Sequence, residues 1–91
     1  MINKVVWKYE LRYYMKYKIP GFYKVVHVGE QSGRAYAWVL LNPEGAEHTY
    51  TFRGYATGEE IPQDVYLNGV HIGSVVFKIG SVWHFYLVGD E

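Results

Sequence analysis

The chain of 91 residues contains no cysteine, which excludes a disulfide scaffold, a thiol nucleophile and any zinc site built on thiolates. It has only three prolines, and no apolar stretch approaches the roughly 18 residues that a membrane-spanning helix needs. Met1 is not followed by the apolar segment of a secretory signal peptide. We therefore expect a cytoplasmic protein that has no contact with membranes.

An excess of charge of one sign is also missing. Nine basic residues balance nine acidic ones, and this zero net charge argues against a generic polyanion binder. Hydrophobic residues make up 49% of the chain and aromatic residues 19%, so the composition is too apolar for a disordered protein. The length allows one domain over residues 1–91, with one small core.

The most regular pattern lies in residues 4–19. All odd positions there are apolar or aromatic, and six of the eight even positions are charged: the odd ones are Val5, Trp7, Tyr9, Leu11, Tyr13, Met15, Tyr17 and Ile19. A period of two predicts a strand with one buried face. Sixteen residues would span about 53 Å, which is too long for an ordinary strand. We expect a bent strand that serves two sheets, two strands that meet at a bulge near Glu10 to Tyr13, or a strand end that pairs with another chain.

The remaining sequence predicts a series of hairpins. Strands are expected over residues 22–29, 34–41, 47–55, 65–67, 70–72, 75–77 and 82–88. Turn signals stand between them at Pro20-Gly21, Asn42–Gly45, Asn68-Gly69 and Gly80-Ser81. No segment has a helical period, so no long helix is predicted. The predicted fold is a single small antiparallel barrel or sandwich of six to seven strands, with meander-like hairpins and a long bent first strand.

Signatures of catalysis are weak. The serines that a triad would need, which are Ser32, Ser74 and Ser81, lie outside any nucleophile elbow. The four histidines lack the spacing of a local chelate, although alternation places His48 and His84 among apolar strand residues. We therefore predict no enzyme, no cofactor and no metal site. A metal enzyme that uses His48 or His84 ranks last among the alternatives.

The charges are unevenly distributed along the chain. Residues 1–24 hold six basic residues and one acidic one, whereas residues 25–91 hold three basic and eight acidic ones. The zero net charge is thus +5 followed by −5. The charged face of the first strand also carries one tyrosine. The candidate partner-binding residues are Lys8, Arg12, Tyr14, Lys16 and Lys18.

Three interpretations fit this basic face. Lysines on an edge strand prevent aggregation between sheets. The face can also dock an acidic protein surface, on a partner or on a second copy. Alternatively, its lysines can follow the phosphates of a single-stranded nucleic acid while Tyr14 stacks on a base. We predict a non-catalytic binding or assembly module that makes protein contacts, with nucleic acid as the alternative. Carbohydrate binding is disfavoured because Trp7, Trp38 and Trp83 are expected to be buried.

Overall fold

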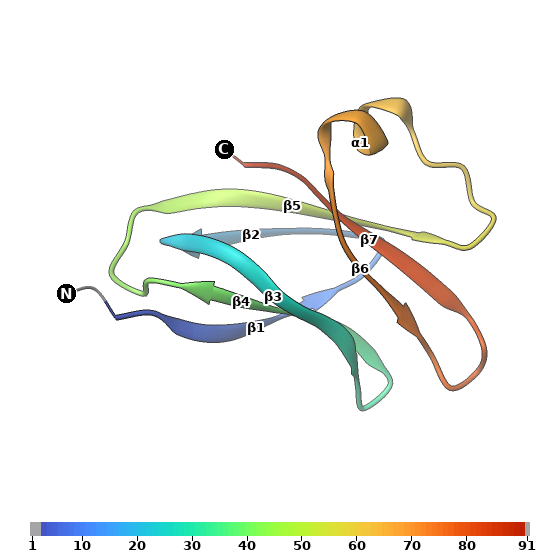
Figure 1. Cartoon of the computed structure of the whole chain (residues 1–91), viewed down its shortest axis with the longest axis horizontal. Coiled ribbons are helices and arrows are strands. Elements are labelled where there is room, and N and C mark those ends of the chain that lie inside the picture. The colour runs from blue at the N-terminus through green and yellow to red at the C-terminus, as the bar shows by residue number, and fades with distance from the viewer. Residues whose placement is uncertain (1–2, 91) are drawn as a thin grey trace.

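The structure is a computed structural model that describes residues 3–90 (Figure 1). Over these residues it contains seven strands and one short helix, α1 (Gln63–Asn68). The strands are β1 (Val5–Leu11), β2 (Tyr14–Pro20), β3 (Phe22–Gln31), β4 (Arg34–Leu41), β5 (Glu47–Ala56), β6 (Val70–Val76) and β7 (Val82–Asp90).

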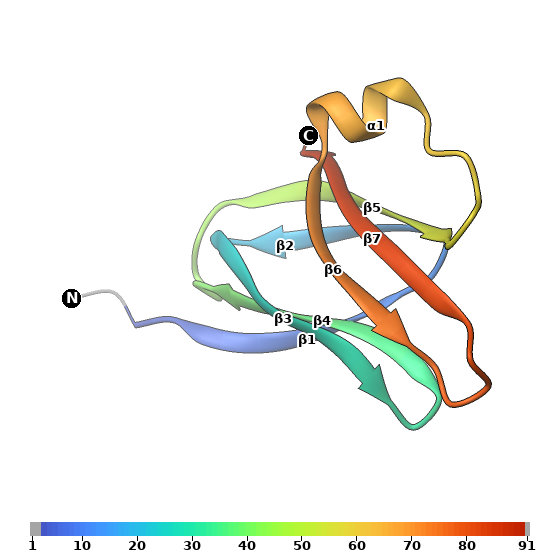
Figure 2. The same ribbon diagram turned by 45° about the vertical axis from the view of Figure 1, so that its right-hand side comes forward.

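These strands form two antiparallel sheets. One sheet has the order β1-β4-β3 and the other the order β2-β5-β7-β6, and the second view shows how they face each other (Figure 2). The predicted all-β fold with six to seven strands is confirmed. The sheets do not close into one barrel, because β3 and β6 are edge strands and no strand pairing joins them in the described part of the chain.

The predicted long first strand is two strands, which are separated at Arg12 and Tyr13. Of the three expected alternatives, the structure matches two strands that meet near Glu10 to Tyr13. β1 pairs with β4 in one sheet, and β2 pairs with β5 in the other. The Gly54 N–H donates to the Tyr13 carbonyl at 3.0 Å, which holds the break against β5. Odd-numbered residues keep to the inner face in both halves, since Leu11 and Ile19 are both buried.

The core lies between the two sheets and takes residues from both. Strand β4 contributes alternate small and branched side chains to it, and the complete buried cluster is Leu11, Ile19, Ala35, Ala37, Val39, Leu41, Phe52, Val75 and Phe85. Alternation along β4 explains this burial, because Tyr36 and Trp38 point away from the buried face. One core shared by both sheets is what a chain of this length can supply.

Two of the predicted hairpin turns are corners between the sheets. Pro20-Gly21 leads from β2 to β3, and residues 42–46 lead from β4 to β5, so neither connection joins paired strands. The two corners bind each other, because Gly21 donates to the Ala46 carbonyl at 2.9 Å and Asn42 donates to the Gly21 carbonyl at 3.0 Å. The meander prediction therefore holds for β3–β4 and β6–β7 but is wrong for these connections.

Residues 65–67, predicted as a strand, form the middle of helix α1 instead. Pro62 precedes the helix, Asp64 lies in its first turn, and Val65 is its one buried residue. Proline has a backbone angle suited to a helix start, and an acidic residue stabilises the first turn. Gly69 ends the helix by donating to the Val65 carbonyl at 2.8 Å, so Asn68-Gly69 terminates a helix rather than forming a hairpin. In the described part of the chain, no helix has the length and hydropathy that a membrane crossing requires.

The segments 70–72 and 75–77 were predicted as separate strands, but they belong together. Strand β6 runs from Val70 to Val76, with a register shift between His71 and Gly73 against β7. The turn to β7 is longer than the predicted two residues, since the Phe77 N–H donates to the Ser81 carbonyl at 2.9 Å. The hairpin itself is confirmed.

Candidate protein-binding surface

The β1 half of the first strand uses its lysine within the molecule. Lys8 faces Trp38 of β4 across the strand pair, which places it on the outer face of the three-stranded sheet. Its ammonium donates to Gln31 Oε1 at 2.7 Å and lies 4.5 Å from the centre of the Tyr36 ring. Lys8 is therefore held against the β3–β4 hairpin.

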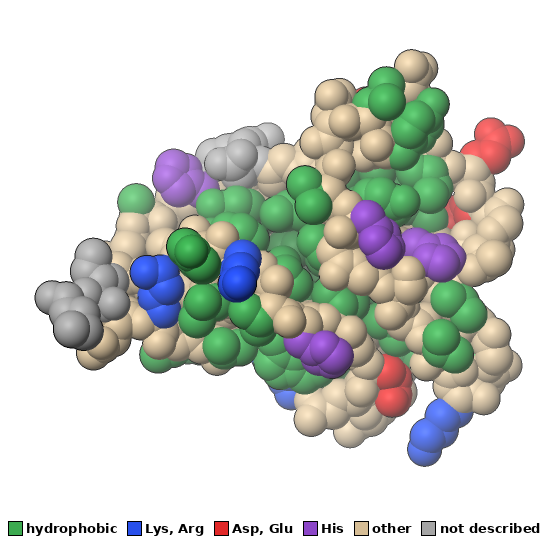
Figure 3. Space-filling view, in the orientation of Figure 1, with side chains coloured by type: hydrophobic (Ala, Val, Ile, Leu, Met, Phe, Trp, Pro, Cys, Tyr) green, Lys and Arg blue, Asp and Glu red, His purple; other side chains and the backbone are tan. Residues whose placement is uncertain are grey.

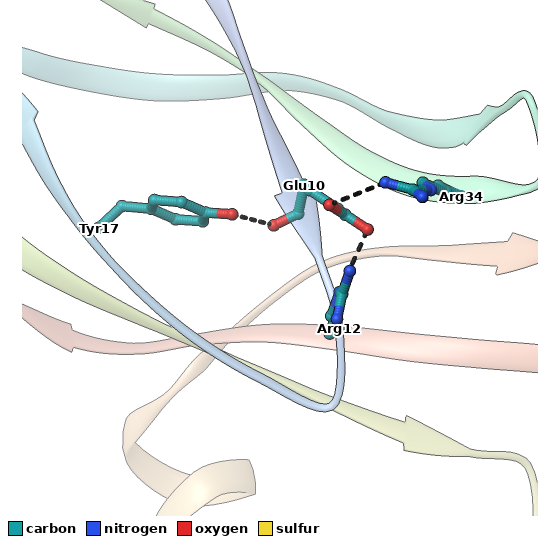
Figure 4. Close-up of polar contacts among 4 residues, drawn as sticks. All are labelled: Glu10, Arg12, Tyr17 and Arg34. Atoms are coloured by element: carbon teal, nitrogen blue, oxygen red, sulfur yellow. Dashed lines mark hydrogen bonds and ion pairs between the residues drawn. The ribbon is translucent and has the colours of Figure 1, made fainter.

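The carboxylate of Glu10 forms ion pairs with two arginines near β1 (Figure 4). Arg12 Nε lies 3.2 Å from Glu10 Oε2, and Arg34 Nη1 lies 3.7 Å from Glu10 Oε1. Both arginine side chains are more than half exposed, so these ion pairs contribute little stability. They do direct the Arg12 guanidinium back toward β1 and away from β2.

Tyr17 connects the two halves of the strand. Its hydroxyl donates to the Glu10 carbonyl at 2.7 Å (Figure 4), and its ring centre lies 5.0 Å from that of Tyr9. Burial raises the pKa of Tyr17, and the nearby Glu10 carboxylate raises it further. Burial likewise raises the pKa of Tyr9, with a smaller effect from Glu47.

The β2 half presents Tyr14, Lys16 and Lys18 on the outer face of the four-stranded sheet. Tyr14 faces Arg53 of β5, and the guanidinium lies 5.5 Å from the centre of the tyrosine ring. Tyr14 is 42% exposed, and both lysines are exposed. Among residues 3–90, no hydrogen bond or ion pair engages Lys16 or Lys18. These two side chains remain available to a partner.

The structure thus divides the five predicted residues between the two sheets. Lys8 and Arg12 belong to the surroundings of β1, and both are occupied by internal contacts. The three residues on β2 stay together and gain a neighbour, Arg53, through the pairing of β2 with β5. Strand pairing is what brings Arg53 beside Tyr14, so no local signal could have shown it. We name Tyr14, Lys16, Lys18 and Arg53 the β2 face.

The predictions for the tryptophans need correction. Trp7 shares the inner face with Val39 but is 44% exposed, and Val5 on the same end of β1 is 40% exposed. Trp38 lies on the outer face between Tyr36 and His27 and is partly buried. Trp83 is also only partly buried, although it packs against the core.

A hydroxyl and imidazole network crosses the β6–β7 hairpin and was not foreseen. Ser74 Oγ lies 2.7 Å from His84 Nδ1 and 3.2 Å from His71 Nε2, and Thr57 Oγ1 lies 2.7 Å from His84 Nε2. Both nitrogens of His84 thus meet hydroxyls, and no carboxylate completes a triad among the described residues. No group of three metal-ligating side chains occurs in this part of the chain either, and His48 is exposed.

These observations define a small all-β domain of two facing antiparallel sheets that carries a basic face on one edge strand. The chain belongs to a family described as a domain of unknown function (DUF7352), which matches residues 2–91. No curated protein and no solved structure matches the chain.

Proposed function

We propose that this domain is a non-catalytic binding and assembly module that contacts an acidic protein surface through the β2 face. The observation that carries the proposal is a pair of exposed lysines, without hydrogen-bond or ion-pair partners among residues 3–90, beside a half-exposed tyrosine. Tyrosine and arginine are typical of interface hot spots, and complementary charges accelerate association. The cytoplasmic location of the protein stays a prediction.

The geometry of β2 favours contact through its face rather than addition of a strand. β2 is an edge strand, and charged lysines on such a strand oppose pairing with a strand from another molecule. The outer face around these lysines stays open, because their partners on β5 are the small residues Thr49 and Thr51. An acidic surface can therefore reach both ammonium groups together.

A second copy of the chain offers one such acidic surface. Glu59 and Glu60 are exposed in the segment that leads into α1, and Asp64 is exposed in the first turn of the helix. Contact between this segment and the β2 face of another copy is heterologous, because two different surfaces meet. Self-association is therefore the first form of the proposal to be tested.

Sedimentation velocity across a salt series tests it. Raising the salt from about 0.01 to 1 M shortens the Debye length from about 30 to about 3 Å, so an association of exposed charges should weaken. The double variant Lys16→Glu with Lys18→Glu should weaken self-association about tenfold, and Lys78→Glu serves as the control. Mixing the double variant with a Glu59→Lys, Glu60→Lys variant should restore part of the association.

Poly-L-glutamate extends the test to acidic polypeptides in general. We expect salt-dependent binding that the double lysine variant loses and that Lys78→Glu keeps. A chain that stays monomeric at low salt and ignores poly-L-glutamate contradicts the proposal.

The alternative function, binding of single-stranded nucleic acid, is favoured by the half-exposed Tyr14 ring beside Arg53. Stacking of one base on an aromatic ring contributes about 1–3 kcal/mol. If oligothymidine binds more tightly than poly-L-glutamate and Tyr14→Ala abolishes that binding, nucleic acid replaces protein as the partner.

A further inference from the structure

The open seam between the two sheets forms a groove. The edge strands β3 and β6 converge where Gly73 packs on Val28, since a Cβ added to Gly73 would lie 2.8 Å from the Val28 Cβ. Toward their first residues the two strands diverge, as both ribbon views show (Figures 1 and 2). A groove of about 370 Å³ lies there, which falls within the range of about 300–1,000 Å³ typical of ligand sites.

The walls of this groove are mainly apolar. Phe22 and Val25 contribute from β3, and Ile72 and Leu87 contribute from β6 and β7. In the space-filling view, hydrophobic side chains gather in the hollow between β3 and β6 (Figure 3). Tyr23 and Val70 at the rim of the groove are each 61% exposed. Covering these apolar groups with a ligand removes them from water, which favours binding.

Exposed apolar side chains also occur on the helix that precedes β6. Tyr66 and Leu67 of α1 are 54% and 63% exposed and precede Val70 closely in the chain.

The backbone at the seam favours an extended ligand. β3 and β6 each end a sheet, and no backbone hydrogen bond links them among residues 3–90. Edge strands present unpaired N–H and C=O groups, which an added peptide strand can satisfy while its alternate side chains enter apolar pockets. A lipid chain would leave these backbone groups without partners.

The charge of the rim specifies the ligand further. Lys24 lines the groove, and the ammonium of Lys4 lies 5.2 Å from the centre of the Tyr23 ring. Among the side chains that the structure describes, no acidic one lines the groove. Basic side chains also lie near the start of β3 in the space-filling view (Figure 3). The rim is therefore complementary to a negatively charged segment.

We propose that the seam groove binds an extended peptide segment of a partner protein in which apolar and acidic residues alternate. This site is separate from the β2 face, and its occupant would lie along the gap between β3 and β6. The apolar side chains would contact Phe22, Ile72 and Leu87, while the acidic ones would meet Lys24.

The proposal is tested by selecting, from a random library of displayed peptides of about ten residues, those that bind the full chain. We expect enriched peptides with alternating apolar and acidic residues. The Val70→Glu and Lys24→Glu variants should each bind them about tenfold more weakly. Both residues are exposed, so neither change endangers folding.

Each variant has a matched control. Val76→Glu places the same charge at the other end of β6, where the side chain is 69% exposed, and Lys78→Glu reverses a lysine outside the groove. Both controls should bind the peptides normally. The double variant Lys16→Glu with Lys18→Glu should also bind normally, so failure of the β2 proposal and failure of this one can be told apart.

Amide chemical shifts locate the bound peptide. They should change at residues 22–25 and 70–72 when a selected peptide is added. The proposal is overturned if the selection enriches no peptides or enriches mainly basic ones. It is also overturned if both groove variants bind the peptides normally, or if the shift changes are confined to the β2 face. Binding of palmitate to the groove, with no binding of any peptide, would overturn the proposal as well.

Discussion

The two halves of the first strand have the same alternating pattern but different surroundings. In β1, Val5 and Trp7 belong to the inner face by register and yet remain 40% and 44% exposed. In β2, Ile19 is fully buried near the end of the strand. The lysines differ in the opposite sense, since Lys8 donates a hydrogen bond to Gln31, whereas Lys16 makes no hydrogen bond or ion pair within the part of the chain that the structure describes. Alternation defines a face, whereas neighbouring elements decide whether that face is covered.

The largest expected effect separates the two ends of this strand. Ile19→Ala should lower the free energy of unfolding by about 2–5 kcal/mol, because it empties a fully buried site. Val5→Ala should cost less than about 1 kcal/mol, because Val5 is already partly hydrated. Urea denaturation of both variants measures the difference, and equal losses would show that the two ends are equally covered.

A second prediction concerns the junction between the halves. A Cβ at Gly54 would lie 2.6 Å from Cε1 of the buried Phe85 and 3.1 Å from the Arg12 carbonyl oxygen. Gly54→Ala should therefore destabilise the protein by about 1–3 kcal/mol through overpacking. Gly33→Ala has open space around its Cβ but a positive φ, and it serves as a control for backbone strain alone. A stability of Gly54→Ala at or above that of the wild type would argue against this packing.

The hydrogen bond between the halves gives a smaller effect. Tyr17→Phe removes the hydroxyl that donates to the Glu10 carbonyl and should cost about 0.5–1.5 kcal/mol in thermal or urea unfolding. Tyr23→Phe removes an exposed hydroxyl and should leave stability unchanged. If the two variants behave alike, the Tyr17 contact does not hold β1 to β2.

The lysines of the two halves should differ by still less. Lys8→Ala loses its hydrogen bond to Gln31 and its contact with the Tyr36 ring, and should cost about 0.5–1 kcal/mol. Lys16→Ala should change the unfolding free energy by no more than about 0.5 kcal/mol. A reversed order in urea denaturation would show that Lys16 rather than Lys8 supports the fold.

The last prediction concerns stability at alkaline pH. Tyr9 and Tyr17 have raised pKa values in the folded protein, so the unfolded chain loses these protons first as pH rises past about 10. Their contribution to stability is complete below that pH and is lost above it. Urea denaturation between neutral and alkaline pH should show this loss, and Tyr17→Phe should make it shallower. An unchanged profile would mean that Tyr17 titrates as it does in water.

Much of the fold was predictable from local pattern. The strand over residues 34–41 was predicted with its observed bounds, because its ends coincide with a loop and a turn signal. The length of residues 4–19 excluded one ordinary straight strand, but it left a bent strand, two strands that meet near Glu10 to Tyr13, and a projecting strand end as alternatives. Turn chemistry was less informative, because Pro20-Gly21 suits a corner between sheets as well as a hairpin.

The candidate site was predictable only in part. Tyr14, Lys16 and Lys18 lie on one face because they alternate along β2. Lys8 has the same parity, but its strand belongs to the other sheet. The seam groove combines residues from β3, β6 and β7 that are far apart in the chain, so local patterns contain no trace of it.

The sequence by itself determined that this protein is an all-β domain without thiols, that residues 4–19 are amphipathic, and that most basic residues lie within residues 1–24 and most acidic ones after them. These properties depend on composition and on a period of two, which are local. Only the tertiary structure decided which strands pair, which tryptophans stay exposed, which lysines are occupied, and that residues 63–68 form a helix. Pairing and burial depend on contacts between distant segments, and those contacts exist only when the chain is folded.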